Sequence, residues 1–176
     1  MKKKRLRNID YFYEIFNSPV GILYLIFYGN KLTEIRFDKP SNMPLKSSSK
    51  NTLQRELREY FDNGLDIFSQ ELHFTTGTEF DRKVWLTLKE VPFGETRTYK
   101  WLAERIGNPN ASRAVGQSLS RNPIPIVLPC HRIIESDGSI GGFSAGIAIK
   151  RRLLDMEYYI KLSKNRGKIF SGEEDG

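Results

Sequence analysis

The first third of the chain is predicted to form strands, because its apolar residues come in short runs rich in aromatic and β-branched side chains. These runs cover residues 11–16, 20–28 and 31–37. Turn-forming residues separate them, first Asn17-Ser18-Pro19 and then Gly29-Asn30. Short strands joined by tight turns predict a small antiparallel meander.

A helix is predicted to follow these strands. Apolar residues recur at helical spacing over residues 53–61, and Gly64 stands where a glycine can end the helix. The segment Thr75-Thr76-Gly77 then has the composition of a linker. We therefore expect residues 1–76 to form an N-terminal α/β domain.

Beyond this linker the pattern predicts short helices. Thr78 can cap the first, Thr98 can cap the second, and a third is expected from Ala111 to about Ser120. The second and third are joined by the turn Asn108-Pro109-Asn110. Two short helices joined in this way are typical of a helix-turn-helix, whose second helix enters a DNA groove. A plain pair of antiparallel helices with solvated charges is the alternative.

The last part of the chain is predicted to contain a strand at Val127–Ile134, a glycine-rich loop at Gly141–Gly146 that can serve as a wing, and a final helix. The apolar face of that helix includes Leu153, and Glu157 lies on the same stripe one turn later. We expect residues 77–163 to form a mainly α domain of winged helix-turn-helix type. Residues 164–176 are expected to form a disordered tail.

Charge favours a polyanionic partner. The chain has 176 residues and a formal net charge of +7, and released counterions drive basic proteins onto nucleic acid. From Arg97 to Arg121 we count five cations and a single anion, Glu104. No signal peptide is recognisable at the N-terminus, and the longest apolar run, near residues 20–28, is too short to cross a bilayer. We therefore expect a soluble, cytoplasmic protein.

The single cysteine, Cys130, is the main candidate for chemistry. It stands in the sequence Pro129-Cys130-His131-Arg132. One cysteine excludes an internal disulfide, and with two histidines it leaves no standard structural zinc set, so no metal is expected. Imidazole can take the proton of a thiol, and a carboxylate can orient the imidazole, a role for which Glu157 is the best candidate. A packing role for Cys130 and a solvated position for Glu157 are the alternatives.

Several separated blocks resemble one family. TEFDRKVW, VPFGETRTYKWLA, GNPNASRAVGQSLSRNPIPIVLPCHRII, GGFSAG and IKRRLLDMEY occur in the order found in the O6-alkylguanine-DNA alkyltransferases, also called methylated-DNA–protein-cysteine methyltransferases. The resemblance implies an N-terminal domain of ribonuclease-H-like topology. It also implies a monomer, free of cofactors, that binds double-stranded DNA carrying O6-alkylguanine and moves the alkyl group irreversibly to its own cysteine.

The resemblance assigns roles in the reaction to five residues. Cys130, His131 and Glu157 match a proton-transfer chain in which a water molecule joins the thiol to the imidazole. Asn122 matches an asparagine that braces the turn near the cysteine. Tyr99 matches a tyrosine whose hydroxyl donates toward guanine N3, which helps because the departing guanine is an anion.

The resemblance also assigns residues that contact DNA and the everted base. Arg113 matches a finger that fills the space left by a base rotated out of the duplex through the minor groove. The remaining DNA contacts are expected from the small residues Ser112, Ala114 and Gly116 around it, from Tyr99 and from a further cation, Arg121. The base pocket is expected to include Arg132, Ile133, Phe143 and Ser144. Phe143 departs from the tyrosine found in several relatives.

Two other functions fit parts of the pattern. A winged-helix regulator with a passive or sensing thiol predicts sequence-specific binding and a dimer. A cysteine hydrolase built on Cys130, His131 and Glu157 predicts turnover of acyl substrates without dependence on Arg113.

Overall fold

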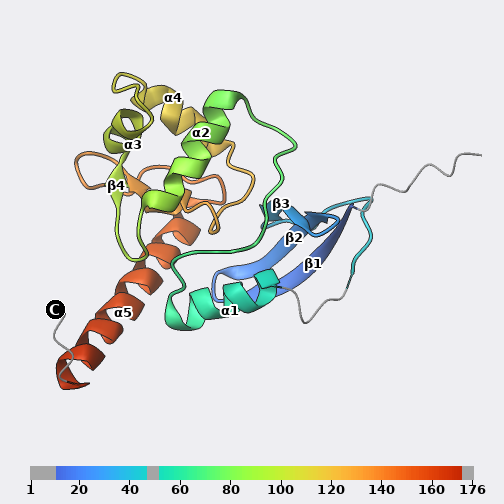
Figure 1. Cartoon of the computed structure of the whole chain (residues 1–176), viewed down its shortest axis with the longest axis horizontal. Helices are drawn as coiled ribbons and strands as arrows, with labels where there is room; N and C mark the ends of the chain where they lie inside the picture. The colour runs from blue at the N-terminus through green and yellow to red at the C-terminus, as the bar shows by residue number, and fades with distance from the viewer. Residues whose placement is uncertain (1–10, 47–51, 172–176) are drawn as a thin grey trace, which may run out of the picture.

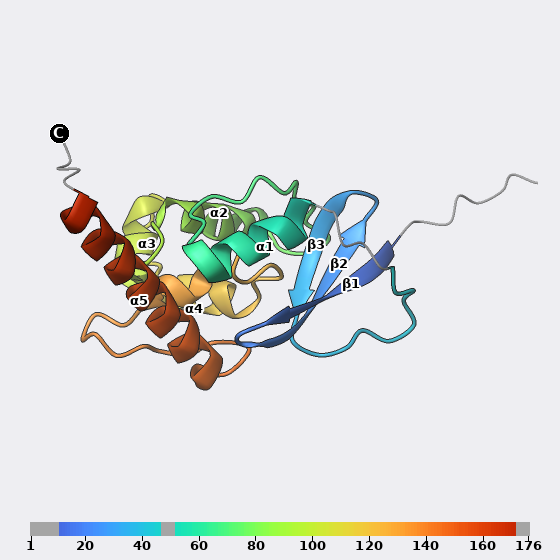
Figure 2. The ribbon, with the colours of Figure 1, turned by 90° about the horizontal axis from the view of Figure 1, so that it is seen from below.

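The N-terminal half contains the expected meander and helix. The computed structural model describes residues 11–46 and 52–171. Strands β1 (Tyr11–Ser18), β2 (Gly21–Tyr28) and β3 (Lys31–Arg36) form an antiparallel sheet in chain order, and α1 (Thr52–Asn63) lies beside it (Figures 1 and 2). The meander and the helix predicted from the sequence are therefore confirmed.

Local residue choices explain these elements. Gly29 has a positive φ of 58° at the turn between β2 and β3, a conformation that costs glycine least. Gly64, with φ 75°, ends α1, and its amide donates to the carbonyl of Tyr60 at 3.1 Å. The apolar stripe of α1 is fully buried at Leu53, Leu57 and Tyr60. This stripe fixes which face of α1 turns toward the rest of the protein.

The C-terminal half is mainly helical (Figure 1). Both predicted N-caps are confirmed, since the side chain of Thr78 accepts from the amide of Asp81 and that of Thr98 accepts from the amide of Trp101. In chain order its elements are α2 (Glu79–Thr87), η1 (Leu88–Glu90), β4 (Arg97–Thr98), α3 (Tyr99–Arg105), α4 (Ser112–Ser120), η2 (Cys130–Arg132), β5 (Ile133–Ile134) and α5 (Ile147–Ser171).

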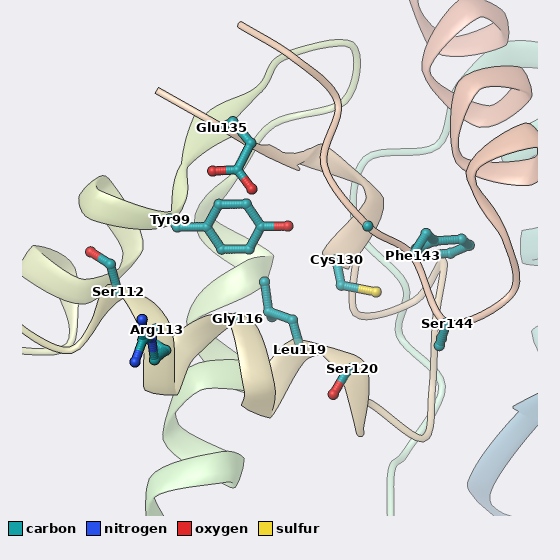
Figure 3. Close-up of a pocket in the computed structure, with 11 residues that line it drawn as sticks. Tyr99, Ser112, Arg113, Gly116, Leu119, Ser120, Cys130, Glu135, Phe143 and Ser144 are labelled. Carbon is teal, nitrogen blue, oxygen red and sulfur yellow. The ribbon is translucent and has the colours of Figure 1, made fainter. Parts of the chain in front are cut away.

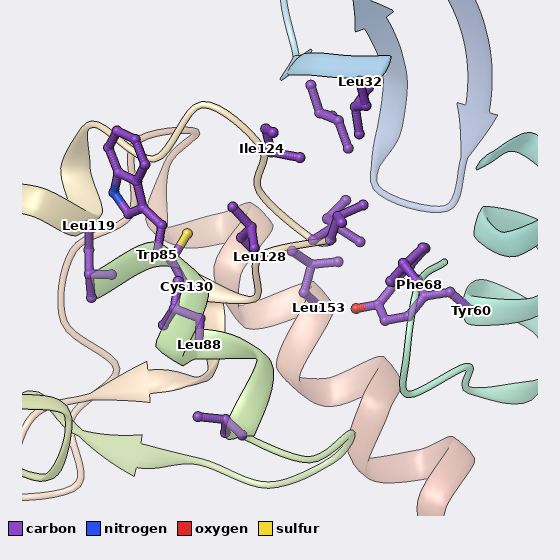
Figure 4. Close-up of a cluster of buried hydrophobic side chains, with 14 of the residues drawn as sticks. Leu32, Tyr60, Phe68, Trp85, Leu88, Leu119, Ile124, Leu128, Cys130 and Leu153 are labelled. Carbon is purple, nitrogen blue, oxygen red and sulfur yellow. The ribbon is translucent and has the colours of Figure 1, made fainter. Parts of the chain in front are cut away.

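One continuous hydrophobic cluster joins the two halves. It includes Leu32 of β3 and Tyr60 of α1 together with Trp85, Leu128 and Leu153 from the C-terminal half (Figure 4). A backbone hydrogen bond of 2.9 Å from Ile35 to the carbonyl of Pro123 crosses between them. The N-terminal half therefore packs directly behind the segment that carries Cys130.

The strand predicted at Val127–Ile134 is wrong for most of its length. Residues 130–132 form the 3-10 turn η2, and only Ile133 and Ile134 pair as a strand, parallel to β4. Pro129 removes one amide donor from this segment, Pro125 removes another just before it, and Ile126 between them adopts a positive φ of 75°. A chain with these constraints cannot keep a regular ladder, so it folds into a series of turns.

The predicted tail is also wrong in part, because α5 extends to Ser171. Side chains 164–168 are exposed, and the end of the helix projects from the body of the molecule (Figure 2). Lysine and arginine favour helices and stay solvated there, and the segment lacks a proline that would stop it. The rest of the predicted tail, and the basic start of the chain, fall outside the described residues. Within the described part of the chain, the helices are too short or too polar to cross a membrane.

Candidate active site

The thiol of Cys130 lies on a turn that its neighbours hold tightly. The amide of Cys130 donates to the carbonyl of Leu128 at 2.8 Å. The Nδ2 atom of Asn122 donates to the same carbonyl at 2.8 Å, and its Oδ1 atom accepts from the amide of Ile124 at 3.0 Å. Asn122 therefore braces this turn from inside.

A cavity of about 530 Å³ opens beside the thiol. Cys130 is only 5% exposed, but it lines the cavity, so a ligand there can reach the sulfur. Tyr99 and Glu135 lie on one side of Cys130, and Phe143 and Ser144 lie on the other (Figure 3). The predicted residues that line the cavity are Tyr99, Ser112, Arg113, Gly116, Cys130, Phe143 and Ser144.

Four predicted contact residues lie elsewhere. Arg132 and Ile133, expected in the base pocket, are 2% and 0% exposed and do not line the cavity. Arg132 points inward from the 3-10 turn η2, and Ile133 points inward from the short strand β5. Ala114 and Arg121 do not line the cavity either.

Behind the turn lies a second group of buried side chains, which we call the relay: His131, Glu157, Arg132 and Tyr60. The Nε2 atom of His131 is 2.7 Å from Oε1 of Glu157. His131 is 0% exposed and Glu157 is 1% exposed, so the solvated position considered for Glu157 is wrong. Because the carboxylate accepts, Nε2 carries the hydrogen. The other nitrogen, Nδ1, is buried, has no hydrogen-bond partner among the described residues and keeps its lone pair.

The rest of the relay satisfies Glu157 from several directions. Arg132 donates to both carboxylate oxygens at 3.0–3.2 Å and to the carbonyl of Val91 at 2.6 Å. The amide of Gly94 donates to Oε2 at 3.0 Å. Tyr60 donates its hydroxyl to Oε1 at 2.6 Å from α1, in the N-terminal half. Both halves of the chain therefore build the relay.

This environment keeps Glu157 ionised and His131 neutral. Burial alone would raise the pKa of Glu157, but the hydrogen bonds from His131 and Arg132 and the positive charge of Arg132 outweigh it and lower the pKa to about 2. For His131, burial lowers the pKa below its usual value, although Glu157 acts in the opposite direction. A neutral imidazole beside an ionised carboxylate is ready to accept a proton.

The thiol itself is protonated in the free protein at neutral pH. Burial raises the pKa of Cys130 to about 11, while the Asn122 side chain and the positive charge of Lys150 act in the opposite direction. Lys150 is fully buried, and its Nζ atom donates to the carbonyls of Ile133 at 2.6 Å and Gly142 at 3.1 Å. Since only a thiolate is strongly nucleophilic, this cysteine needs a base if it is to act as a nucleophile.

Tyr99 is the first residue of α3 and follows directly after β4. Burial, followed by the negative charge of Glu135, raises the pKa of Tyr99 above its usual value, so its hydroxyl stays a donor. A β-carbon added to Gly116 would lie 3.7 Å from the Tyr99 ring, an ordinary contact distance. The α4 backbone therefore comes close to this ring.

The basic surface predicted between Arg97 and Arg121 is largely neutralised. Arg97 pairs with Glu95 at 2.9 Å and Arg121 with Asp81 at 2.7 Å. Lys100 and Arg105 likewise face Glu104 and Glu90. Arg113 is exposed and takes part in none of the ion pairs found among residues 11–46 and 52–171.

Sequence reasoning missed three residues of this region: Tyr60, Glu135 and Lys150. Lys150 had a usable signal, because it lies on the same helical stripe as Leu153 and Glu157, where a charge needs a buried partner. Tyr60 gave no signal of a polar role, because its apolar spacing predicts only a core residue. Glu135 reaches the cavity through the parallel pairing of β4 with β5, which periodicity does not reveal.

Comparison with known proteins agrees with these features. Residues 79–159 match the family described as "6-O-methylguanine DNA methyltransferase, DNA binding domain". The methylated-DNA–protein-cysteine methyltransferase of Methanosarcina acetivorans is 41% identical over 153 residues, which cover 83% of this chain and 97% of that protein. The equivalent protein of Haemophilus influenzae is 37% identical, over 83% of this chain and 86% of that protein.

Solved structures show the same likeness. The O6-methylguanine methyltransferase of Mycobacterium tuberculosis superposes with a TM-score of 0.78 at 37% identity, covering 85% of this chain and 93% of that one. The O6-methylguanine-DNA methyltransferase of Pyrococcus kodakaraensis superposes with a TM-score of 0.67 at 27% identity, covering 82% and 98%. A small antiparallel sheet with helices is thus the shared architecture. This chain belongs to the methylated-DNA–protein-cysteine methyltransferase family.

Proposed function

We propose that this protein repairs DNA by moving an alkyl group from guanine O6 to Cys130, once per molecule. The single observation that carries the proposal is the position of the only cysteine, which lines an open cavity and is backed by a buried imidazole–carboxylate pair. Members of this family are named for a cysteine acceptor, and this chain offers one cysteine. The M. tuberculosis relative, similar over most of the chain, has been crystallised in complex with DNA.

The transfer is a direct displacement at the alkyl carbon. The thiol proton passes to Nδ1 of His131 through a bridging water molecule, and Glu157 stabilises the imidazolium that forms. The thiolate then forms an S–C bond as the C–O6 bond breaks, and the electron pair stays with the guanine. The product is a thioether, which explains why each molecule acts once.

The leaving group is assisted from the other side of the cavity. A guanine anion leaves more readily if its charge is neutralised as it develops. The Tyr99 hydroxyl, kept protonated by its surroundings, donates to guanine N3, and Ser144 hydrogen-bonds near O6. Together these contacts orient the base with its O6 edge toward the sulfur and its N3 edge toward Tyr99.

The base reaches the cavity by rotating out of the duplex. Helices α3 and α4 form the helix-turn-helix, the loop at Gly141–Gly146 is the wing, and α4 enters the minor groove. Arg113, exposed at the cavity, occupies the space that the base leaves. Ser112, Ala114, Gly116 and Arg121 contact the DNA backbone around it.

The finer architecture belongs to the same proposal. We propose that residues 1–76 form a domain of ribonuclease-H-like topology and that residues 77–163 form the winged helix-turn-helix domain. The protein acts as a monomer in the cytoplasm, on double-stranded DNA that carries O6-alkylguanine.

The test is the mass of the intact protein after incubation with a duplex containing O6-methylguanine. Wild type gains one methyl group, Cys130→Ala gains none, and both bind DNA with similar affinity. Loss of the lesion in the presence of Cys130→Ala would overturn the proposal. Sequence-specific binding without a mass gain would favour a regulator, and repeated turnover of an acyl substrate would favour a hydrolase.

A further inference from the structure

We propose that Tyr60 is a positioning residue for the proton transfer: its hydroxyl shares Oε1 of Glu157 with His131 and so limits how tightly the imidazole holds a proton. The proposed transfer uses Cys130, His131 and Glu157 and gives this buried hydroxyl no role. The inference rests on the proposed function in one respect, that His131 is the base. The hydrogen bonds that it invokes are present in the free protein.

Apolar packing fixes the position of the Tyr60 hydroxyl. The side chain is fully buried, and its ring lies against Phe68 and Phe93 with centroids 5.7 and 5.6 Å apart. The hydroxyl points from α1 toward the helix that carries Leu153 and Glu157 (Figure 4). Burial, followed by the charge of Glu157, raises the pKa of Tyr60 well above its usual value, so the hydroxyl keeps its hydrogen. The N-terminal half therefore supplies one fixed donor to this carboxylate.

Several donors share Oε1 of Glu157. This oxygen is 2.6 Å from the Tyr60 oxygen and 2.7 Å from Nε2 of His131, and these two donor atoms are 3.4 Å apart. Arg132 also donates to Oε1, at 3.2 Å from Nε and 3.1 Å from a terminal guanidinium nitrogen. A carboxylate oxygen has about two lone-pair sites, so each further donor weakens the bonds that the others make. The hydrogen bond from Tyr60 therefore reduces the negative charge that Oε1 offers to His131.

The groups around His131 act on its proton in opposite directions. From α5, the carboxylate of Glu157 favours the protonated ring, whereas the charge of Lys150 opposes it. From η2, the charge of Arg132 opposes it as well, and so does burial. From α1, the Tyr60 hydroxyl weakens the pull of the carboxylate on the ring. An imidazole that is already protonated cannot accept the proton of the thiol, so this hydroxyl helps to keep the base neutral until transfer begins.

The first experiment is an NMR titration of the histidine rings in the full-length protein without DNA. The chain has two histidines, and His73 is exposed, so it serves as an internal reference for His131. In Tyr60→Phe we expect the midpoint of the His131 titration to move to higher pH by about 0.5–1 unit, because Oε1 of Glu157 then holds the ring proton more tightly. Tyr24→Phe, which removes a hydroxyl from the sheet of the same half, should leave this midpoint where it is in wild type.

The second experiment follows single-turnover methyl uptake from a duplex with O6-methylguanine, measured by intact mass at a series of pH values. Transfer needs a neutral His131, so its rate falls as the pH falls. In Tyr60→Phe this fall should begin at a higher pH. On the acidic side the variant should therefore be slower than wild type by about 3–10-fold, the factor that corresponds to a shift of about 0.5–1 unit. On the alkaline side the two rates should be nearly equal.

Each other outcome overturns the inference. Equal slowing of transfer by Tyr60→Phe at every pH, with the His131 midpoint of wild type, makes Tyr60 a purely structural residue. No change in either experiment means that Arg132 alone saturates Oε1 of Glu157. A His131 midpoint at lower pH means that the hydroxyl strengthens the hold on the proton. Failure of wild type to take up methyl refutes the proposed function itself, whereas the titration without DNA still decides whether Tyr60 acts on His131, so the two failures are distinguishable.

Discussion

The two sides of the Cys130–Arg132 turn differ in how their polar groups are held. On the inner side, the relay is almost completely buried, and both oxygens of Glu157 accept several hydrogen bonds. On the outer side, Tyr99 is half-buried and Arg113 is exposed at an open cavity. The imidazole that we propose as the base is thus part of the folded core, whereas the groups that we propose to contact DNA are left available. Substitutions on the inner side should therefore cost stability, and those on the outer side should change only transfer.

The largest effect is expected for Glu157→Gln. Removing this charge leaves the buried Arg132 with only the exposed carboxylate of Asp66, 3.8 Å away, as an ionic partner. Loss of the buried partner costs about 3–5 kcal/mol in buried ion pairs of this kind. Urea denaturation should show this loss in the free energy of unfolding, and methyl transfer should fail. Asp155→Asn, on the exposed side of the same helix, is the matched control and should change stability by less than about 0.5 kcal/mol. A stable Glu157→Gln variant would show that the relay contributes little to the fold.

Low pH should reveal how much the stability of the wild type depends on His131 and Glu157. His131 and Glu157 both have pKa values in the folded protein below their ordinary ones. The unfolded chain then binds more protons, so stability falls as the pH falls. The loss should begin below the ordinary histidine pKa of about 6.5, and the part due to Glu157 should appear between pH 4.5 and about 2. In Glu157→Gln this second part should be absent.

A smaller effect is expected for Tyr60→Phe. The change removes one donor from Oε1 of Glu157 and leaves the aromatic packing with Phe68 and Phe93 in place. Hydrogen bonds to charged groups contribute about 1.5–3 kcal/mol, and the urea midpoint should fall accordingly while DNA binding is kept. The control is Tyr24→Phe, in the sheet of the same half. Equal losses of stability in Tyr60→Phe and Tyr24→Phe would mean that the hydrogen bond from Tyr60 to Glu157 contributes nothing beyond an ordinary tyrosine hydroxyl.

On the inner side of the turn, a residue could be predicted from the sequence only where its own helix gave the signal. Glu157 stood out because a carboxylate on an apolar helical stripe needs a buried partner, and the structure supplies Arg132 and His131. Tyr60 could not be found in this way. It lies 97 residues from Glu157 in the chain, and its spacing on α1 is the same as that of a purely apolar core residue. The N-caps, the helices and the meander were predictable because each depends on residues that are close together in the sequence.

The outer side shows a different limit. Counting charges from Arg97 to Arg121 indicated a basic surface, but carboxylates from outside that window, such as Asp81 and Glu90, lie against it in the fold. The strand predicted at Cys130 failed for a related reason. Its apolar composition favours a strand, whereas the proline at position 129 and the brace from Asn122 impose turns. Tertiary contacts override local preference at both places.

The smallest effect is expected for Arg113→Ala, because rotating a base out of the duplex costs only a few kcal/mol and the proposed role of Arg113 is to offset part of that cost. Transfer from duplex DNA should slow by about 10–100-fold, measured as the single-turnover rate of methyl uptake. The urea midpoint should stay that of wild type, since Arg113 is exposed. With single-stranded DNA, where the base is already unpaired, the variant should approach the wild-type rate. Arg105→Ala, which removes a cation already paired with Glu90, should leave both rates nearly unchanged. If both variants slowed transfer from duplex and single strand alike, Arg113 would act through charge alone, and the outer side would bind DNA without assisting the rotation of the base.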